Sequence, residues 1–269
     1  HAQHLHAALS NHGRCYHLSA RMCPVHRREQ LKEIKELLRK GADCRVISTQ
    51  LIEAGVNIDF PVVYRAAAGI DSVAQAAGRC NREGKLERGE VYVFRSTERY
   101  GQATSWQRLT AEVGRMILDA YDDPLSLPAV EGYFQRLFSY KGEEGLDREG
   151  ILRLFEKGVG DLAFPFEDVD WKFSIIEQGT KDLIIPYGED GKALVDELRT
   201  AESPWKYARR LQGYTISIYP NEFRELERAG EIDLFGDRFY VLNDMTKYSE
   251  ETGLKNRKDN AGEGSLLIV

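Results

Sequence analysis

The first hundred residues alternate between short apolar runs and amphipathic stretches. Four runs are rich in β-branched and aromatic residues and predict strands: residues 15–19, 44–49, 61–67 and 89–95. The stretches between them carry apolar residues at helical spacing and predict helices: residues 2–9, 28–41 and 72–80. Strands separated by helices imply a parallel sheet with right-handed crossovers. We therefore expect residues 1–100 to form an α/β domain that lacks its first strand.

The pattern changes after this domain. Long helical patterns, broken by prolines and a glycine, fill residues 101–160 and predict a helical linker. Residues 161–254 are expected to form a small α+β domain, because short helical patterns separate apolar runs that predict strands: residues 169–191, 211–220 and 238–244. Residues 255–269 are rich in turn-forming and charged residues, which predicts a flexible, frayed tail.

The composition is that of a globular protein. The chain has 269 residues, of which 42% are hydrophobic and 30% are charged. No apolar run reaches the length of a membrane span, so the sequence excludes one and predicts no membrane partner. The four cysteines form no C-x-x-C pair and no secretory signal is visible. We therefore expect reduced thiols and a cytoplasmic protein.

The charge balance argues against a nucleic-acid footprint over the whole surface. The net charge is −6, whereas nucleic-acid binders usually concentrate positive charge. Cations do gather in residues 21–45, and acids gather in residues 142–150. The simplest interpretation of both stretches is a solvated protein face.

The histidines offer little for metal binding. All six lie in the first 26 residues, where His4 and His6 form an H-x-H pair. No carboxylate cluster or tandem His-Asp pair accompanies them, so we interpret them as polar helix positions and predict no metal site. The chain opens at a histidine and is helical in pattern within a few residues, which predicts that an upstream portion of the protein precedes it.

Two stretches carry candidate chemistry. In "RVISTQLIEAGVNIDF", residues 45–60, a strand ends at Thr49, at the sheet edge where ligands of open α/β folds bind. Gly55 can turn the chain so that Asn57 and Asp59 return toward the same edge. Taken alone, this signal is weak.

The second stretch is "DSVAQAAGRCNREGK", residues 71–85. On a helix, Gln75, Gly78, Arg79 and Arg82 share one face, and the small residues around them permit close approach. Two guanidinium groups in one cleft suit a phosphate, because arginine makes bidentate bonds and stays charged when desolvated. The alternative is that these arginines pair with acids on a helix surface.

Together the two stretches resemble motifs V and VI of superfamily 2 helicases, and Q-x-x-G-R-x-x-R is present in full. The amino-acid sequences of these two stretches, together with "HLSARMCPVHRREQLKEI" and "LQGYTISIY", resemble those of the CRISPR-associated helicase-nucleases of type I interference, subtype I-C. The resemblance is strong over residues 1–100 and fainter beyond. It implies that residues 1–100 are the second RecA-like domain of the helicase.

The resemblance also implies an activity and partners. In that family, two RecA-like domains clamp ATP with Mg²⁺ and move along single-stranded DNA, and a nuclease domain with its own divalent metal cuts the strand. A type I CRISPR surveillance complex recruits the enzyme, and phage-encoded inhibitor proteins are further partners. This sequence has no G-x-x-x-x-G-K-[ST] loop, no D-E-x-H box and no tandem His-Asp motif, so we expect this chain alone to be inactive.

Residue roles follow from the same resemblance. Arg79 and Arg82 would be catalytic arginine fingers. Gln75, Gly55 and Asn57 would contact or sense the nucleotide, although the family more often has aspartate where this chain has Asn57. Ser19, Arg21 and Thr49 would contact the DNA backbone, as a translocase that reads no sequence requires.

The C-terminal module resembles the family's lid over the DNA channel. Its aromatic residues Trp171, Trp205 and Tyr214 are interpreted as core residues rather than base-stacking platforms.

Two other functions are compatible with the residues. The first is a stand-alone module that binds nucleic acid or protein without hydrolysis. A Walker A loop upstream of this chain in the parent coding sequence would argue against it. A restriction-type or repair helicase of superfamily 2 would share the arginines but not the wording "LIEAGVNIDFPVVYRA".

Overall fold

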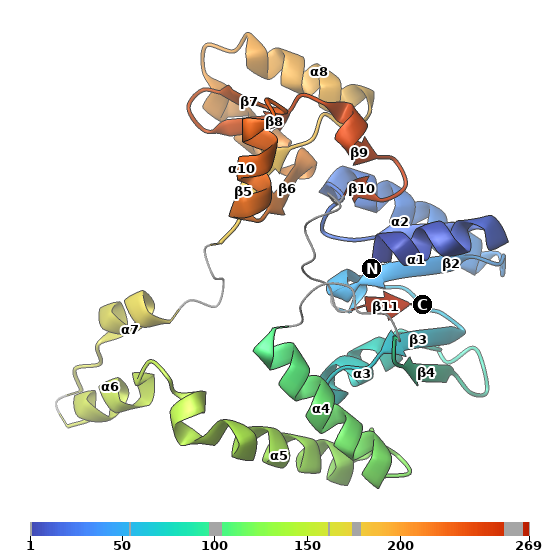
Figure 1. Ribbon diagram of the computed structural model, residues 1–269, viewed down its shortest axis with the longest axis vertical. Helices are drawn as coiled ribbons and strands as arrows, with labels where there is room; N and C mark the ends of the chain where they lie inside the picture. Colours follow the sequence, from blue (N-terminus) through green and yellow to red (C-terminus); the bar gives the residue numbers. More distant parts are fainter. Residues whose placement is uncertain are drawn as a thin grey trace.

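The computed structural model describes six stretches of the chain: residues 2–53, 55–96, 104–160, 162–173, 179–255 and the backbone of 266–268. They form three parts: a five-stranded sheet with its helices, an arm of helices, and a module built on a four-stranded sheet (Figure 1). The candidate site residues belong to the first part.

The five-stranded sheet is mixed. In spatial order its strands are β1 (Cys15–Leu18), β2 (Arg45–Thr49), β11 (Leu266–Ile268), β3 (Val62–Ala66) and β4 (Glu90–Phe94). The pairs β1–β2 and β3–β4 are parallel, whereas β11 is antiparallel to both of its neighbours. The expected α/β class is therefore correct, but the expected parallel sheet is interrupted at its centre.

The strand β11 also corrects the expectation of a frayed tail. Its residues lie in the apolar run "LLIV", and the turn-forming composition that suggested fraying belongs to the residues before it. Residues 256–265 and 269, which the same expectation covered, lie outside the described residues. A backbone segment in the centre of a sheet gains ladder partners on both sides, which favours pairing over fraying.

Helices cover both faces of this sheet. On one face, α1 (Ala2–Leu9) packs against Ile47. On the other face, α2 (Pro24–Arg39) and α3 (Ile70–Ala77) contribute Ile34 and Ala76 to a core that contains Val46 and Val63. Because neighbouring residues of a strand point to opposite faces, Val46 and Ile47 face different helices.

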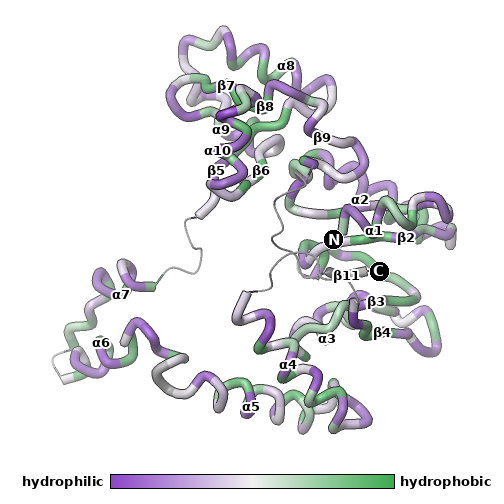
Figure 2. The backbone as a smooth tube through the Cα atoms, viewed as in Figure 1, coloured by the Kyte–Doolittle hydropathy of each residue, from purple (hydrophilic) through white to green (hydrophobic). Residues whose placement is uncertain are grey.

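The helical arm consists of α4 (Ser105–Ala120), α5 (Leu127–Leu146), α6 (Ile151–Gly158) and α7 (Phe166–Lys172). Figure 2 shows hydrophobic and hydrophilic positions alternating along α5, as an amphipathic helix requires. The helix is broken at Gly142, where φ is 64° and ψ is 170°. α4 and α5 pack against α3 through a cluster that includes Ile70 and Tyr133.

α7 replaces part of a predicted strand. The run 169–191 was expected to be extended, yet its first residues belong to this helix. Pro165 precedes the helix, and Glu167 and Asp168 lie in its first turn, which favours a helix N-terminus. Residues 174–178 of the same run lie outside the described residues.

The C-terminal module contains a four-stranded sheet of order β6-β5-β8-β7. Its strands are β5 (Lys181–Ile184), β6 (Thr215–Ile218), β7 (Ile232–Phe235) and β8 (Phe239–Leu242). Its α-helices are α8 (Gly188–Arg199), α9 (Ala208–Leu211) and α10 (Pro220–Arg228). The strand β7 was not expected; it forms a hairpin with β8 around Gly236 and Asp237, both with positive φ.

The aromatic residues of this region are less buried than expected. Trp171 is 85% exposed and Trp205 is 57% exposed, so the expectation of core positions is wrong for both. Tyr214 packs against the core of the module. Trp205 still contacts the module, because its ring lies 5.6 Å from the Phe239 ring and under the Arg238 guanidinium.

The start of α2 joins the module to the five-stranded sheet. Cys23 is buried in the same cluster as Leu183 and Tyr248 of the module. His26 Nδ1 lies 2.8 Å from the Tyr248 hydroxyl, and its ring stacks on Tyr187 with centroids 4.3 Å apart. The short ladder of β9 (Tyr248–Ser249) and β10 (Gly253–Leu254) thus sits against α2.

None of the described helices combines the length and apolar character that crossing a membrane requires. All four cysteines are free thiols.

We expect acid to weaken the fold through His17. Its ring is 1% exposed, and burial is the first cause that lowers its pKa to about 3. The unfolded chain, with a histidine pKa of about 6.5, then binds more protons than the folded chain below that pH. The contribution of His17 to the free energy of unfolding is therefore fully present above pH 6.5. It falls by about 2 kcal/mol between pH 7 and pH 5.

Urea unfolding at the two pH values measures this effect. His17→Gln should lose the part of the pH-dependent difference that His17 supplies, whereas His12→Gln, on an exposed side chain, should keep the whole difference. His26, whose pKa burial also lowers, supplies a further part. Equal pH dependence in His17→Gln and the parent chain would assign the effect to other groups.

Candidate functional site

Arg79 and Arg82 do not lie on a helix face. α3 ends before Gly78, which caps the helix, and the chain then turns through Asn81, whose φ is 47°. The expectation of four residues on one helical face is therefore wrong for both arginines. Gly78 caps the helix with φ −64° and ψ −1°, and the bridge between Cys80 and Phe60 then directs the backbone toward the chain before β3.

Residues 78–82, which we call the arginine turn, are hydrogen-bonded to the segment that connects β2 to β3. The Phe60 N–H donates to the Arg79 carbonyl at 2.9 Å, and the Asn81 N–H donates to the Phe60 carbonyl at 2.8 Å. The Arg82 N–H donates to the Asp59 carboxylate at 2.6 Å. Two stretches that the sequence analysis treated separately therefore form one structural unit.

The two arginine side chains have different surroundings. Arg79 is 8% exposed, and its Nη2 donates to the Glu53 carbonyl at 2.6 Å. Burial, followed by the nearby charge of Arg82, lowers the pKa of Arg79. Arg82 is exposed. One guanidinium is thus held in place, and a second one beside it is accessible to a ligand.

The other nucleotide candidates lie around this unit. Gly55 has a φ of 73°, and a Cβ there would meet no atom within 4 Å, so the turn rather than crowding favours glycine. Asn57 and Gln75 are exposed, the latter on the last turn of α3. Asp59 precedes β3, so it lies at the amino end of that strand and not, as expected, at the carboxyl edge near Thr49.

A buried ion pair lies beneath the arginine turn. Arg65, on β3, is 0% exposed, and its Nη2 lies 3.1 Å from Glu53 Oε1. Burial raises the pKa of Glu53, and the charge of Arg65 opposes that shift. The ion pair with Arg65 fixes the Glu53 side chain, and the Glu53 backbone carbonyl accepts a hydrogen bond from Arg79. The ion pair therefore helps to position Arg79. The sequence analysis missed this pair, whose signal is a charged residue within the apolar run "PVVYRAA".

A hydrogen bond joins α5 to the start of α3, in addition to the packing of Tyr133 against Ile70. The Tyr133 hydroxyl donates to Asp71 Oδ1 at 3.0 Å, and the tyrosine is fully buried. Burial raises the pKa of Tyr133, and the Asp71 charge adds to the shift. Gly114 on α4 also packs closely, since a Cβ there would lie 2.3 Å from the Ala68 carbonyl. The helical arm is therefore in contact with the helix that leads into the arginine turn.

The three candidate DNA contacts differ in accessibility. Ser19 is buried, and its Oγ lies 3.0 Å from His17 Nε2. Arg21 is held by the C-terminal module: Nη1 donates to Glu222 at 3.1 Å and Nε to the Leu254 carbonyl at 2.7 Å. Thr49 ends β2 and is half-buried. Among the described residues, no hydrogen bond joins Ser19, Arg21 or Thr49 to the turn that carries Arg79 and Arg82.

The arrangement favours binding of an anion rather than a cation. It exposes the Arg82 guanidinium, which matches the oxygen geometry of a phosphate, and the exposed Glu83 beside it is paired with Lys85. No cluster of three or more histidine, cysteine or carboxylate side chains that could hold a metal ion occurs within the described stretches.

Comparisons of the sequence with known proteins find CRISPR-associated nuclease/helicases. Residues 1–85 match the family model described as "CRISPR-associated nuclease/helicase Cas3, C-terminal". The CRISPR-associated nuclease/helicase Cas3 of Haloferax volcanii is 40% identical over 79 residues, which are 29% of this chain and 8% of that protein. The protein of the same name from Methanothermobacter thermautotrophicus is 30% identical over 165 residues, 58% of this chain and 18% of that protein.

Solved structures share the fold. T. fusca Cas3 with AMPPNP has a TM-score of 0.54 at 15% identity, and the same protein with ATP has a TM-score of 0.52 at 16% identity. Each match covers 90% of this chain and 34% of the solved chain. The described fold is thus similar to part of the fold of these solved chains. This chain spans less than a fifth of the length of the two curated relatives and about a third of the length of these solved chains.

Proposed function

We propose that this chain is the C-terminal part of an ATP-dependent single-stranded DNA translocase and nuclease that degrades foreign DNA in type I CRISPR interference. In this proposal the five-stranded sheet and its helices are the second RecA-like domain. The helical arm and the C-terminal module follow it as linker and DNA-channel lid. The stretch "LIEAGVNIDFPVVYRA" favours this family over other superfamily 2 helicases, and we propose subtype I-C within it.

One observation carries the proposal: an exposed Arg82 lies beside Arg79, which is locked onto the segment after β2. When bound between two RecA-like domains, ATP supplies the phosphoryl group whose transfer drives movement. Arg82 would donate to the phosphate oxygens, and Arg79 would keep the turn in register with the connecting segment. Gln75 and Asn57 are exposed amides that suit hydrogen bonds to the nucleotide.

These residues fit one side of a nucleotide site. They supply cations and amides, but the sequence contains no phosphate-binding loop and no carboxylate motif for Mg²⁺. We therefore assign Mg²⁺ and the nuclease metal to portions of the protein outside this chain. The names of the solved relatives, which include complexes with ATP and AMPPNP, support a nucleotide as the ligand.

We also propose single-stranded DNA and the type I surveillance complex as partners of the whole protein, with phage-encoded inhibitors as further ligands. Within this chain, Thr49 is the accessible DNA candidate at the end of β2. Arg21 would reach a phosphate only by leaving Glu222, and Ser19 only through movement of its buried surroundings.

The purified chain should show no ATP turnover, because arginine fingers accelerate a reaction that needs a phosphate loop and a magnesium site. A coupled ATPase assay with and without single-stranded DNA measures this. Robust turnover by the pure chain would contradict the assignment as one half of a motor.

The same chain should bind single-stranded DNA weakly and with a marked salt dependence. Each phosphate that a lysine or arginine of the chain neutralises adds about −0.7 to the slope of a plot of log K against log salt concentration. Fluorescence anisotropy of a labelled oligonucleotide at several salt concentrations gives the slope. Nanomolar binding that ignores salt would favour a stand-alone binding module instead.

A further inference from the structure

The helical arm packs closely against the start of α3 (Figure 1). Gly69 precedes α3, and a Cβ on it would overlap the Asp71 carboxylate and the Tyr133 hydroxyl. A Cβ on Gly114 of α4 would overlap the backbone just before α3. Glycine permits this close approach because it has no side chain. Within this contact the Tyr133 hydroxyl donates to Asp71 Oδ1 at 3.0 Å, so the arm makes one specific polar contact with the helix that leads into the arginine turn.

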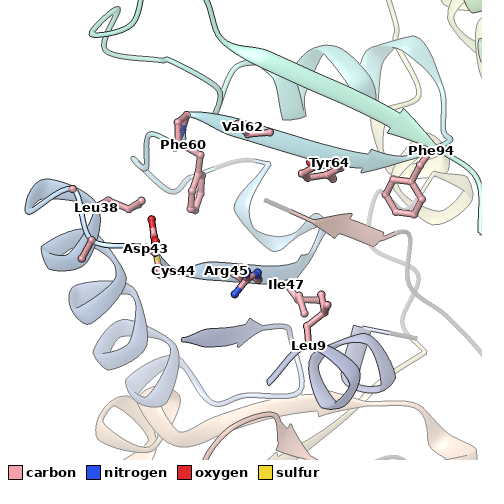
Figure 3. A pocket seen from close by; sticks show the side chains of 13 residues that line it. Leu9, Leu38, Asp43, Cys44, Arg45, Ile47, Phe60, Val62, Tyr64 and Phe94 are labelled. Atoms are coloured by element: carbon pink, nitrogen blue, oxygen red, sulfur yellow. The ribbon is translucent and has the colours of Figure 1, made fainter. Parts of the chain in front are cut away.

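Asp71 also acts on the buried ion pair beneath the arginine turn. Figure 3 shows Tyr64 of β3 lining the cavity between β2 and β3, and neighbouring residues of a strand point to opposite faces. Arg65 therefore points to the other face of the sheet, which α3 covers. Burial lowers the pKa of Arg65, and the charges of Glu53 and Asp71 oppose that shift. Two carboxylates thus attract one guanidinium.

The hydroxyl of Tyr133 affects how the two carboxylates share Arg65. A carboxylate that already accepts from a hydroxyl competes less for a guanidinium, because part of its charge is satisfied. Arg65 Nη2 lies 3.1 Å from Glu53 Oε1, and the Glu53 carbonyl accepts from Arg79. Loss of the hydroxyl frees Asp71 to draw Arg65 away from Glu53. The residue that anchors Arg79 is then held less firmly.

A second route runs along α3 itself. Asp71 lies in the first turn of this helix, Gln75 lies one turn further on, and Gly78 caps the helix. Ile70 packs in the cluster of the arm, whereas Ala76 packs in the core of the sheet. The two ends of one short helix are therefore held by different parts of the molecule. The contact with the arm lies only about two helical turns from the arginine turn.

We propose that Tyr133 is a positioning residue for ATP hydrolysis: through Asp71 it holds the arginine turn in the conformation in which Arg82 faces the nucleotide. The helical arm thereby controls the rate of hydrolysis without any contact with the nucleotide. This inference rests on the proposed function of Arg82 and adds the element that regulates it.

Tyr133→Phe in the full-length protein that contains this chain keeps the buried ring and removes the hydroxyl. Its kcat for DNA-stimulated ATP hydrolysis should fall about tenfold with KM changed less than about twofold, because a displaced arginine finger acts mainly on the transition state. Tyr140→Phe removes a hydroxyl from an exposed side chain of the same helix and should keep both constants. Asp71→Ala should lose as much as Tyr133→Phe. Asp71→Asn, which keeps an oxygen that accepts from Tyr133, should lose less.

The double variant Tyr133→Phe with Arg82→Ala tests whether Tyr133 acts through Arg82. It should hydrolyse ATP no more slowly than Arg82→Ala alone, because a guanidinium that is absent is not misplaced. A further loss of about tenfold would mean that the hydroxyl only stabilises the fold, and it would overturn the inference.

The single variants separate the inference from the proposed function. Normal hydrolysis in Tyr133→Phe, beside a strong loss in Arg82→Ala, would overturn the inference and leave the proposed function intact. Normal hydrolysis in Arg82→Ala would overturn the proposed function, and the inference with it.

Hydrogen exchange supplies a measurement that does not need turnover. In the Tyr133→Phe protein the amides of Asn81 and Arg82, which bond to the segment before β3, should exchange about threefold faster than in the parent. The Tyr140→Phe protein should match the parent. Faster exchange confined to the arm and the start of α3 would contradict the coupling. If Tyr133→Phe fails to fold, Asp71→Ala, on an exposed residue, gives the same comparison.

Discussion

Replacing Arg82 by alanine in the full-length protein that contains this chain should lower DNA-stimulated ATP hydrolysis by about 10³, with nucleotide affinity changed less than about tenfold. The side chain is exposed and its backbone N–H, which alanine keeps, holds the turn on Asp59. The loss therefore reports the guanidinium itself. A factor of 10³ corresponds to about 4 kcal/mol of transition-state stabilisation.

A turnover assay with single-stranded DNA measures the rate of hydrolysis, and a nucleotide-binding titration measures the affinity for the nucleotide. Arg88→Ala removes an exposed arginine from the same segment and should leave kcat unchanged. Near-normal hydrolysis in Arg82→Ala would mean that the arginines serve only to fix the turn. Arg79→Ala is a less selective test, because it also removes the bond to the Glu53 carbonyl. If both arginines act in one closed state, the double variant should lose little more than Arg82→Ala alone.

The sequence predicted the parts of the fold that depend on local periodicity. The strands around Val46 and Val63 and the helix that carries Ile34 follow from apolar spacing, because burial against one core selects that spacing. The tail strand and β7 were missed, since short strands depend on partners far along the chain rather than on their own pattern.

The candidate site was only partly predictable for a similar reason. The residue types at Arg79 and Arg82 indicated a phosphate, but their geometry depends on Gly78 ending the helix and on pairing with the chain before β3. The pairing of Arg21 with Glu222 joins residues 201 positions apart, which no local pattern reveals.

Replacing Arg65 by alanine should destabilise the chain by about 3–5 kcal/mol. The substitution leaves Glu53 buried without the cation that lies 3.1 Å from it, and an uncompensated buried charge is among the costliest defects in a fold. Urea unfolding at pH 7 measures the loss, and Arg88→Ala, on an exposed side chain, should stay within about 0.5 kcal/mol of the parent.

The double variant Arg65→Met with Glu53→Gln separates charge from packing. It removes both charges while keeping side chains of similar length, so it should recover a large part of the stability that Arg65→Ala loses. Because the Glu53 backbone carbonyl still accepts from Arg79, hydrogen exchange around the arginine turn should return toward that of the parent chain. If the double variant is as unstable as Arg65→Ala, the defect comes from packing around the arginine stem, and the ion pair is not what holds Glu53 under Arg79.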